Sequence, residues 1–284
     1  MATPPWREVS PGMRRMLYAA SLLVLSVGIP LFLLTEQTDT YFSWTIRNPL
    51  TAAFLGAAYW SSCALEFLAA RERWWARARI AVPAVLIFTA LTLVVTLLHI
   101  EVFHFNSPQL ITVAGTWVWL AVYAVVPPLM LVLLVRQLRM PGQDEPRGAP
   151  LALWARAVLG SNAAVMVLLG VALMLAPTLA APLWPWELGA LTGRAVGAWL
   201  IGLGIAAGQV ALEGDLGRAR VMLISAVVFS VLQLIALARY PDTFAWTSPQ
   251  GVVYLVFLVD LLVVGGYGWY AARNAVAPSQ TVPA

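Results

Sequence analysis

Eight runs of about 18 or more mostly apolar residues dominate this chain and restrict it to one class of fold. The runs fall at 16–34, 49–70, 80–100, 109–135, 152–176, 190–212, 221–238 and 250–272. A helix that rises about 1.5 Å per residue crosses the roughly 30 Å of bilayer hydrocarbon in a run of this length. The sequence therefore predicts an all-α, polytopic integral membrane protein with eight transmembrane helices.

Composition agrees with this class. Hydrophobic residues make up 61% of the 284 residues and charged residues 11%, whereas about 25% charge is usual in a water-soluble domain. The net charge of +4 then belongs to the connections of a membrane protein. We therefore expect contact with membrane lipid and no nucleic-acid partner.

The chain also repeats itself at an offset of 141 residues without a gap. Three separate patches align, in which Leu50, Thr51, Gly56, Glu72, Arg77, Arg79, Phe103, Ser107 and Pro108 lie over Leu191, Thr192, Gly197, Glu213, Arg218, Arg220, Phe244, Ser248 and Pro249. Because solenoid repeats run roughly 20–50 residues, this long period indicates a duplicated multi-helix unit. We expect four-helix repeats at 1–140 and 151–273, a polar linker at 141–150 and a disordered tail at 274–284.

The arginines predict the orientation. With eight spans, fourteen of the seventeen arginines fall on one side, and only Arg47, Arg194 and Arg239 do not. Positively charged connections stay on the cytoplasmic side, so both termini are predicted to be cytoplasmic in a protein of the cell membrane. Four spans return the chain to its starting side. The two repeats should then be parallel, related by a pseudo-two-fold axis along the membrane normal.

Helix starts and helix contacts carry further signals. Asn48, Ser107 and Ser248 each precede a proline, which predicts a capped helix start. Small residues at a spacing of four indicate that the second and sixth helices pack closely, and we expect them to pack on each other across the pseudo-two-fold axis. These pairs are Ala52 with Gly56, Gly193 with Gly197, and Gly204 with Gly208. The tryptophans, Trp44, Trp184 and Trp186 among them, predict an aromatic belt at the membrane surfaces.

Charges within apolar runs are the best pointers to a functional site, because each costs several kcal/mol unless it is paired or hydrated. Asp260 falls near the centre of the eighth run, and Arg194 about one turn inside the sixth. We predict a salt bridge between them, either structural or also in contact with a substrate or proton, with Glu187 competing for Arg194. These three are the predicted substrate-binding residues. Glu66 is expected to snorkel to the membrane surface.

Two related polar turns follow the second and sixth helices. Arginines in such turns set orientation and contact anionic lipid. The glutamates suggest the hypothesis that each one clamps an arginine of its own turn. The predicted structural residues are Glu72, Arg77, Arg79, Glu213, Arg218 and Arg220.

Catalytic signatures are missing from the sequence. It has no nucleotide-binding loop, serine elbow, zinc-binding H-E-x-x-H or cysteine pair, so we expect no catalytic residue, cofactor or metal. His99, Glu101 and His104 cluster at the end of the third run, where hydrogen bonding at the interface is favoured over metal or quinone chemistry.

Three classes of function remain. The leading interpretation is a transporter or channel-like protein for a small solute, lipid or ion, with a site at the repeat interface. The alternative is a non-catalytic membrane subunit or scaffold that binds a protein partner or lipid, which short loops and few intramembrane polar groups favour. An intramembrane enzyme comes third. A polar cavity lined by Arg194 and Asp260 would favour transport, and a solid interior beside an exposed groove would favour the scaffold.

Overall fold

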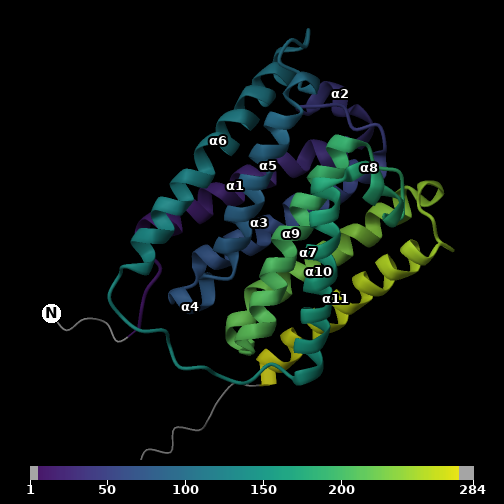
Figure 1. The fold of residues 1–284 in the computed structure, drawn as a ribbon. Helices are drawn as coiled ribbons and strands as arrows, with labels where there is room; N and C mark the ends of the chain where they lie inside the picture. The colour runs from purple at the N-terminus through teal and green to yellow at the C-terminus, as the bar shows by residue number, and fades with distance from the viewer. Residues whose placement is uncertain (1–5, 275–284) are drawn as a thin grey trace, which may run out of the picture.

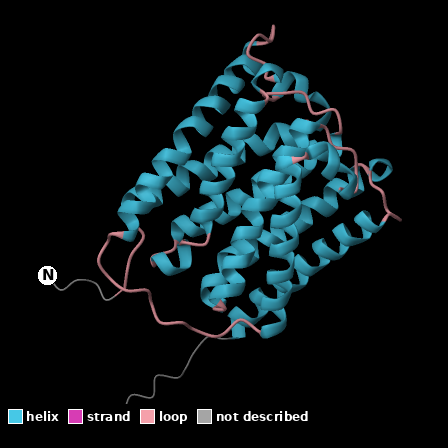
Figure 2. Ribbon diagram, viewed as in Figure 1, coloured by secondary structure: helices cyan, strands magenta, loops and turns pink. Residues whose placement is uncertain are grey.

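The computed structural model describes residues 6–274, and in them eight long helices lie side by side (Figure 1). These are α1 (Pro11–Leu33), α3 (Pro49–Arg71), α5 (Ala81–Leu98), α6 (Leu110–Leu138), α7 (Leu153–Leu175), α9 (Ala190–Glu213), α10 (Leu216–Arg239) and α11 (Pro249–Asn274). All eight are long and apolar enough to cross a membrane, and the described residues form no strand (Figure 2). The prediction of an all-helical chain with eight candidate spans is confirmed. Of the tail expected at 274–284, residue 274 is still part of α11, and 275–284 lie outside the described residues.

Short helical turns fill the connections between the spans. They comprise α2 (Thr38–Tyr41), α4 (Trp75–Ala78), α8 (Pro177–Ala180), η1 (Thr35–Gln37), η2 (Ile100–Val102), η3 (Ala181–Leu183) and η4 (Pro241–Thr243). Since their backbone groups bond locally, they turn the chain between spans with few unpaired polar groups.

Capping chemistry places two helix starts five residues earlier than hydropathy predicts. The Ser10 hydroxyl accepts the Met13 amide at 3.2 Å and starts α1, and an Asp215 carboxylate oxygen accepts the Arg218 amide at 2.8 Å and starts α10. Both first turns contain arginines, which lower local hydropathy although the cap and the first hydrogen bonds are already in place.

The three predicted caps before proline have different outcomes. The Asn48 side chain accepts the Leu50 amide at 2.9 Å, and the Ser248 hydroxyl accepts the Gly251 amide at 3.0 Å, so both cap as predicted. The prediction for Ser107 is wrong. Its hydroxyl accepts the amide of Gln109 at 3.2 Å within a preceding turn, and α6 begins only at Leu110.

The helices form two quartets with matching contacts. In the first quartet (α1, α3, α5, α6), α1 packs on α3 and α5 on α6; in the second quartet (α7, α9, α10, α11), α7 packs on α9 and α10 on α11. Between the quartets, α3 packs on α10, and α5 packs on α9. The second helix of each quartet therefore packs on the third helix of the other quartet, and the two quartets share one hydrophobic core.

The small residues of α3 and α9 serve a different contact from the predicted one. A Cβ on Gly56 would lie 2.6 Å from the Phe32 amide nitrogen of α1, and a Cβ on Gly197 would lie 2.7 Å from the Gly170 carbonyl oxygen of α7. The expectation that α3 and α9 pack on each other through these residues is therefore wrong. Each glycine instead lets its helix approach the first helix of its own quartet.

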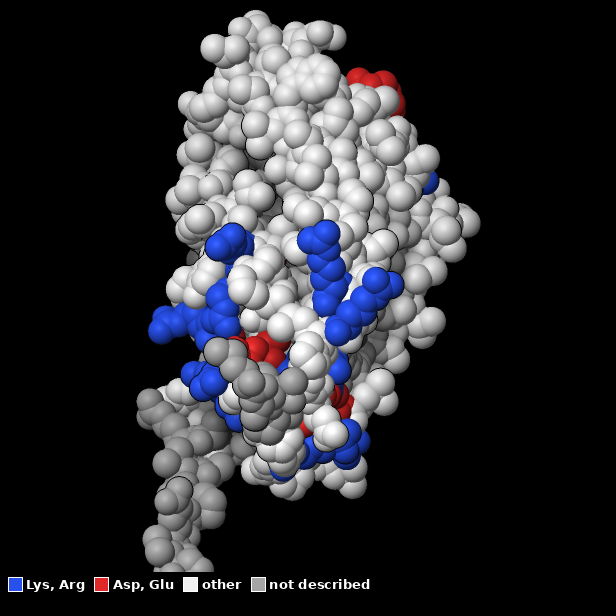
Figure 3. Space-filling view, turned by 90° about the vertical axis from the view of Figure 1, so that its left-hand side faces the viewer, with Lys and Arg blue, Asp and Glu red and all other residues white. Residues whose placement is uncertain are grey.

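Charged side chains concentrate at one end of the bundle, as Figure 3 shows for one face. We call this the arginine-rich end; it comprises the segment 6–10, the turns 72–80 and 214–215, and the linker 139–152. The Arg7 amide bonds the Gln143 carbonyl at 2.8 Å, which ties the start of the described chain to the linker. The opposite end comprises the connections 34–48, 99–109, 176–189 and 240–248.

Replacing Gly56 by alanine should destabilise the protein by roughly 1–3 kcal/mol, because the new methyl group meets backbone that cannot move aside. The matched control is Gly115→Ala, where a Cβ would meet no heavy atom within 4 Å. Reversible unfolding in detergent measures both. Equal unfolding free energies for the two variants would contradict the packing described.

Candidate functional site

A groove of about 680 Å³ opens at the opposite end, where α3 and α9 begin. We call it the loop groove. Much of its lining is polar, and comes from Thr45, Arg47, Asn48, Thr51, Glu187, Thr192 and Thr243. Of the three predicted substrate-binding residues, Glu187 is exposed and lies here, whereas Arg194 and Asp260 do not line it. The loop groove is thus a polar depression shared by both quartets.

Below the loop groove, one face of α9 runs the length of the bundle against α5. Its residues stand three or four apart, which places them on one side of the helix. In order they are Leu191, Ala195, Trp199, Gly202, Ala206 and Gln209, and each lines a groove or cavity. We call this contact between α5 and α9, with α3 alongside, the seam. It joins the two quartets.

Small cavities follow the seam. The first, of about 10 Å³, shares Trp44 and Leu191 with the loop groove, and the next, of about 20 Å³, shares Phe88 and Trp199 with the first. A void of about 10–15 Å³ holds one water molecule. The seam is therefore closed to any larger solute in this arrangement.

Aromatic rings close the half of the seam nearer the loop groove, which we call the upper half. The Phe88 and Trp199 rings lie 3.8 Å apart between centroids, and the Tyr59 hydroxyl bonds that of Tyr123 at 2.6 Å. Trp44 is only 3% exposed, so it fills the interior and does not belong to the predicted interfacial belt; Trp184 and Trp186 are buried as well. The Trp44 indole N–H finds no acceptor among the described residues, which leaves a donor at the junction of groove and cavity.

A second groove, of about 600 Å³, opens at the arginine-rich end of the seam. We call it the linker groove, because Gly142, Gln143 and Asp144 of the linker form part of its wall. The remaining lining combines apolar side chains of α5 and α6 with Arg7, Arg79 and Gln209. The seam thus has a wide groove at each end and narrow voids between them.

Glu66 lies where the sequence interpretation did not place it. It is 1% exposed and does not snorkel to the surface. Its Oε1 accepts the Ser62 hydroxyl at 3.0 Å, and its Oε2 is buried with no partner in the described chain. The sequence does hold a signal, because Thr51, Tyr59, Ser62 and Glu66 share one face of α3.

The predicted Arg194–Asp260 salt bridge is absent from the described residues. Arg194 donates to the Met174 carbonyl of α7 at 3.1 Å and contacts His99 Nε2 at the end of α5 at 2.8 Å. Asp260 is half-buried on α11, which packs on α10 and α7 rather than on α9. Arg194 therefore braces three helices at the opposite end, and its predicted contact with substrate stays a prediction, as does that of Asp260.

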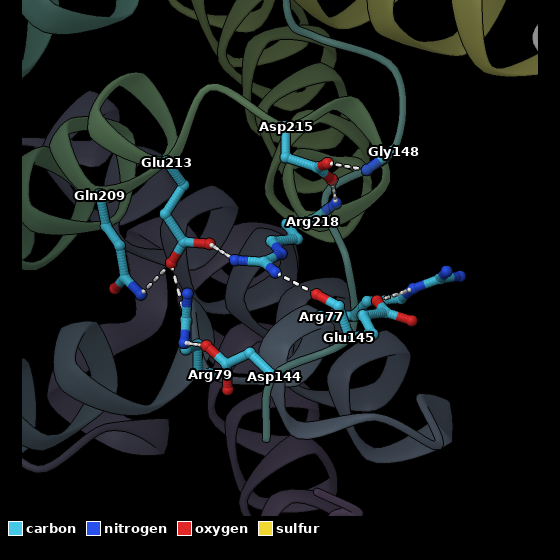
Figure 4. A network of polar contacts seen from close by, with 9 residues as sticks. All are labelled: Arg77, Arg79, Asp144, Glu145, Gly148, Gln209, Glu213, Asp215 and Arg218. Atoms are coloured by element: carbon cyan, nitrogen blue, oxygen red, sulfur yellow. Dashed lines mark hydrogen bonds and ion pairs between the residues drawn. The ribbon is translucent and has the colours of Figure 1, made fainter. Parts of the chain in front are cut away.

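Two ion pairs cross between the quartets at the arginine-rich end (Figure 4 shows the first). Arg79 bonds Glu213 at 2.8 Å and also Asp144 of the linker, and Arg220 approaches Glu72 at 3.6 Å. The hypothesis that each glutamate clamps an arginine of its own turn is wrong for Glu72. It holds for Glu213, whose second oxygen lies 3.4 Å from Arg218, but the shorter bond goes to the other quartet.

The linker is held within the same network (Figure 4). Glu145 pairs with Arg77 at 2.5 Å, and its carbonyl accepts from Arg218 at 2.6 Å. The Gly148 amide donates to Asp215, the residue that caps α10, at 2.6 Å. The predicted polar linker therefore bonds residues of both quartets, Arg77 on one side and Asp215 and Arg218 on the other. The six predicted structural residues all lie in or beside this network.

No family model, curated protein or solved structure matches the chain. Among the described residues, no group of three or more His, Cys, Asp or Glu side chains could hold a metal ion.

Glu213→Gln should destabilise the protein by roughly 2–4 kcal/mol, because the largely buried carboxylate, 11% exposed, bonds Arg79, Arg218 and Gln209. The matched variant Glu72→Gln should cost less than about 1 kcal/mol, since its partner Arg220 is 56% exposed and 3.6 Å away. Unfolding in detergent, with Arg79→Gln as a further variant, measures the difference. A larger loss for Glu72→Gln would contradict this assignment.

Stability should fall as pH drops below about 6.5, in part because of His99. Burial, and then the charge of Arg194, lowers the pKa of His99 below its ordinary value. At a pH between the two pKa values, His99 is protonated in the unfolded chain and neutral in the folded chain. The contribution of His99 to folding stability is therefore fully present above the unfolded pKa and is lost as the pH falls from there through the folded pKa. Melting temperatures at pH 7.5 and 5.5 should differ less in His99→Gln than in the wild type, and an unchanged difference would contradict this role of His99.

Proposed function

We propose that this protein is a transporter of the cell membrane that moves a small apolar or amphipathic solute along the seam. The observation that carries the proposal is the line of cavities along the contact of the two quartets, between the loop groove and the linker groove. Transporters built from paired units commonly bind their solute at such an interface.

Relative tilting of the quartets is the motion that the seam requires. Because α5 and α9 belong to different quartets, their separation at one end widens one groove while the other end stays closed. The Phe88–Trp199 contact would form the middle barrier, and the Arg79–Glu213 ion pair the barrier at the arginine-rich end.

We further propose that the quartets are a duplicated, parallel unit and that the arginine-rich end faces the cytoplasm. The matching helix contacts and the two related ion pairs, Glu72 with Arg220 and Glu213 with Arg79, support the duplication. The arginine bias supports the orientation, which would open the loop groove to the outside.

The lining indicates the kind of solute. The first cavity is lined by aromatic and aliphatic side chains with two threonine hydroxyls, Thr92 and Thr96, and by no charged side chain. A hydrated inorganic ion would lose its water there without replacement ligands. An apolar or aromatic group with one polar atom fits better, because the Trp44 N–H offers a free donor.

The competing proposal is a non-catalytic subunit or scaffold that binds a membrane protein or lipid. The small size of the seam cavities, about 10 and 20 Å³, favours it, because a scaffold needs no hollow interior. Measuring whether the seam ever admits water separates the two proposals.

Cysteine accessibility provides that measurement. After Cys63→Ala, the variants Ala195→Cys and Ala206→Cys place thiols in the upper and lower seam, and Leu168→Cys, 71% exposed, gives a lipid-facing control. With a membrane-impermeant thiol reagent, we expect Ala195→Cys to react from the outside and Ala206→Cys from the cytoplasmic side, while Leu168→Cys reacts from neither. Seam thiols as unreactive as the control would reject transport and favour the scaffold.

A further inference from the structure

Glu66 is an ionisable side chain placed inside the membrane-spanning part of α3. It precedes Arg71, the last residue of that helix, by five positions, which corresponds to about 7.5 Å at a rise of about 1.5 Å per residue. At 1% exposure it is shut off from both the linker groove and the lipid. Intramembrane carboxyl groups of this kind are costly and usually functional.

The contacts of Glu66 leave it without a positive partner. Among the described residues, its carboxyl group accepts one hydrogen bond, from the Ser62 hydroxyl, and Oε2 has no partner. Arg14 of α1 does not bond the Glu66 carboxyl group. It donates to the backbone carbonyls of Ala70 and Glu72, at the C-terminal end of α3. A carboxylate in this setting would be a buried, unpaired charge, whereas a carboxylic acid is tolerated.

Few other titratable groups belong to the elements around it. Helix α5 has none, and α6 contributes the Tyr123 hydroxyl, which is already bonded to Tyr59. The charged groups of α9 and α10 near this end, Glu213, Arg218 and Arg220, bond within the ionic network. The other titratable or charged side chains on α1, α3 and α6 are Arg15 and Tyr18, Cys63 and Arg71, and Arg136.

Glu66 touches the seam through Ser62. The Ser62 side chain lines the seam cavity of about 20 Å³, the one nearer the arginine-rich end, together with Gly202 and Ala206 of α9. About one turn earlier on α3, Tyr59 lines the cavity of about 10 Å³ below the loop groove. Water entering the lower seam would therefore reach the Ser62–Glu66 pair first. This places the carboxyl where a change of hydration accompanies opening.

We propose that Glu66 is the proton-binding site of this protein, protonated while the seam is closed and ionised when opening brings water to it. The proposal rests on the transport function and names its coupling ion. On opening, the O–H bond of the carboxylic acid breaks, the proton passes to water and leaves through the open groove, and a carboxylate remains. Closing requires the uptake of one proton, so no other reactant is needed.

Linkage gives the expected size of the effect. If each opening releases one proton, the ratio of open to closed protein rises about tenfold per pH unit. The labelling rate of Ala206→Cys reports this ratio in the full-length protein. Dividing that rate by the rate of the same reporter in a Glu66→Gln background cancels the ionisation of the thiol itself, because glutamine mimics the protonated acid and cannot release a proton.

The expected result is a normalised labelling rate that rises about tenfold per pH unit between roughly pH 6 and 8. Ser62→Ala removes the hydrogen bond to Glu66 but keeps the carboxyl group. The labelling rate should therefore rise with the same slope, but over a shifted pH range. A flat profile in a protein whose seam thiols do react would overturn the proton site and leave transport standing.

A second measurement applies even if the seam never opens. Infrared spectroscopy of the full-length protein at pH 7 should show the carbonyl band of a protonated carboxylic acid that disappears in Glu66→Gln. A spectrum unchanged by this substitution would reject proton binding at Glu66 whatever the outcome of the labelling experiment.

Discussion

The crossed packing of the two quartets is the constraint on which the remaining structure depends. Because α3 packs on α10 and α5 on α9, neither quartet closes a core of its own. The seam exists because two helices from different quartets face each other along their whole length. The ion pairs that join the turns after α3 and α9 to the other quartet follow from the same exchange.

The two ends of the seam are closed by different physical means. At the arginine-rich end, charged groups and the linker form a bonded network around Glu213 and Arg218. Toward the opposite end, aromatic packing of Trp44, Phe88 and Trp199 closes it. The hydrophobic part of aromatic packing is non-directional, whereas bonded charges favour one geometry. The opposite end should therefore open more easily, because opening there requires less rearrangement of hydrogen bonds.

Hydropathy was sufficient to predict all eight long helices, because the cost of unpaired backbone in lipid leaves few alternatives. Partners of individual side chains were not predictable. Arg194 and Asp260 stand at suitable depths, but α9 and α11 are not packed on each other, and depth along a helix carries no information on its neighbours. Glu72 was assigned the right kind of partner on the wrong element, since sequence proximity suggests local pairs. Glu66 was assigned to the surface because its burial depends on helices distant in sequence.

The exchange of helices between quartets has a consequence for biogenesis. Helix α3 leaves the ribosome long before α10, its partner, and at roughly 5–20 residues per second the delay is on the order of ten seconds. The face of α3 that later packs on α10 includes Phe54 and Ser61. During that delay, this face can contact only lipid, the translocon or a chaperone. Nascent first-half chains should accordingly be retained by the insertion machinery until the second half is synthesised.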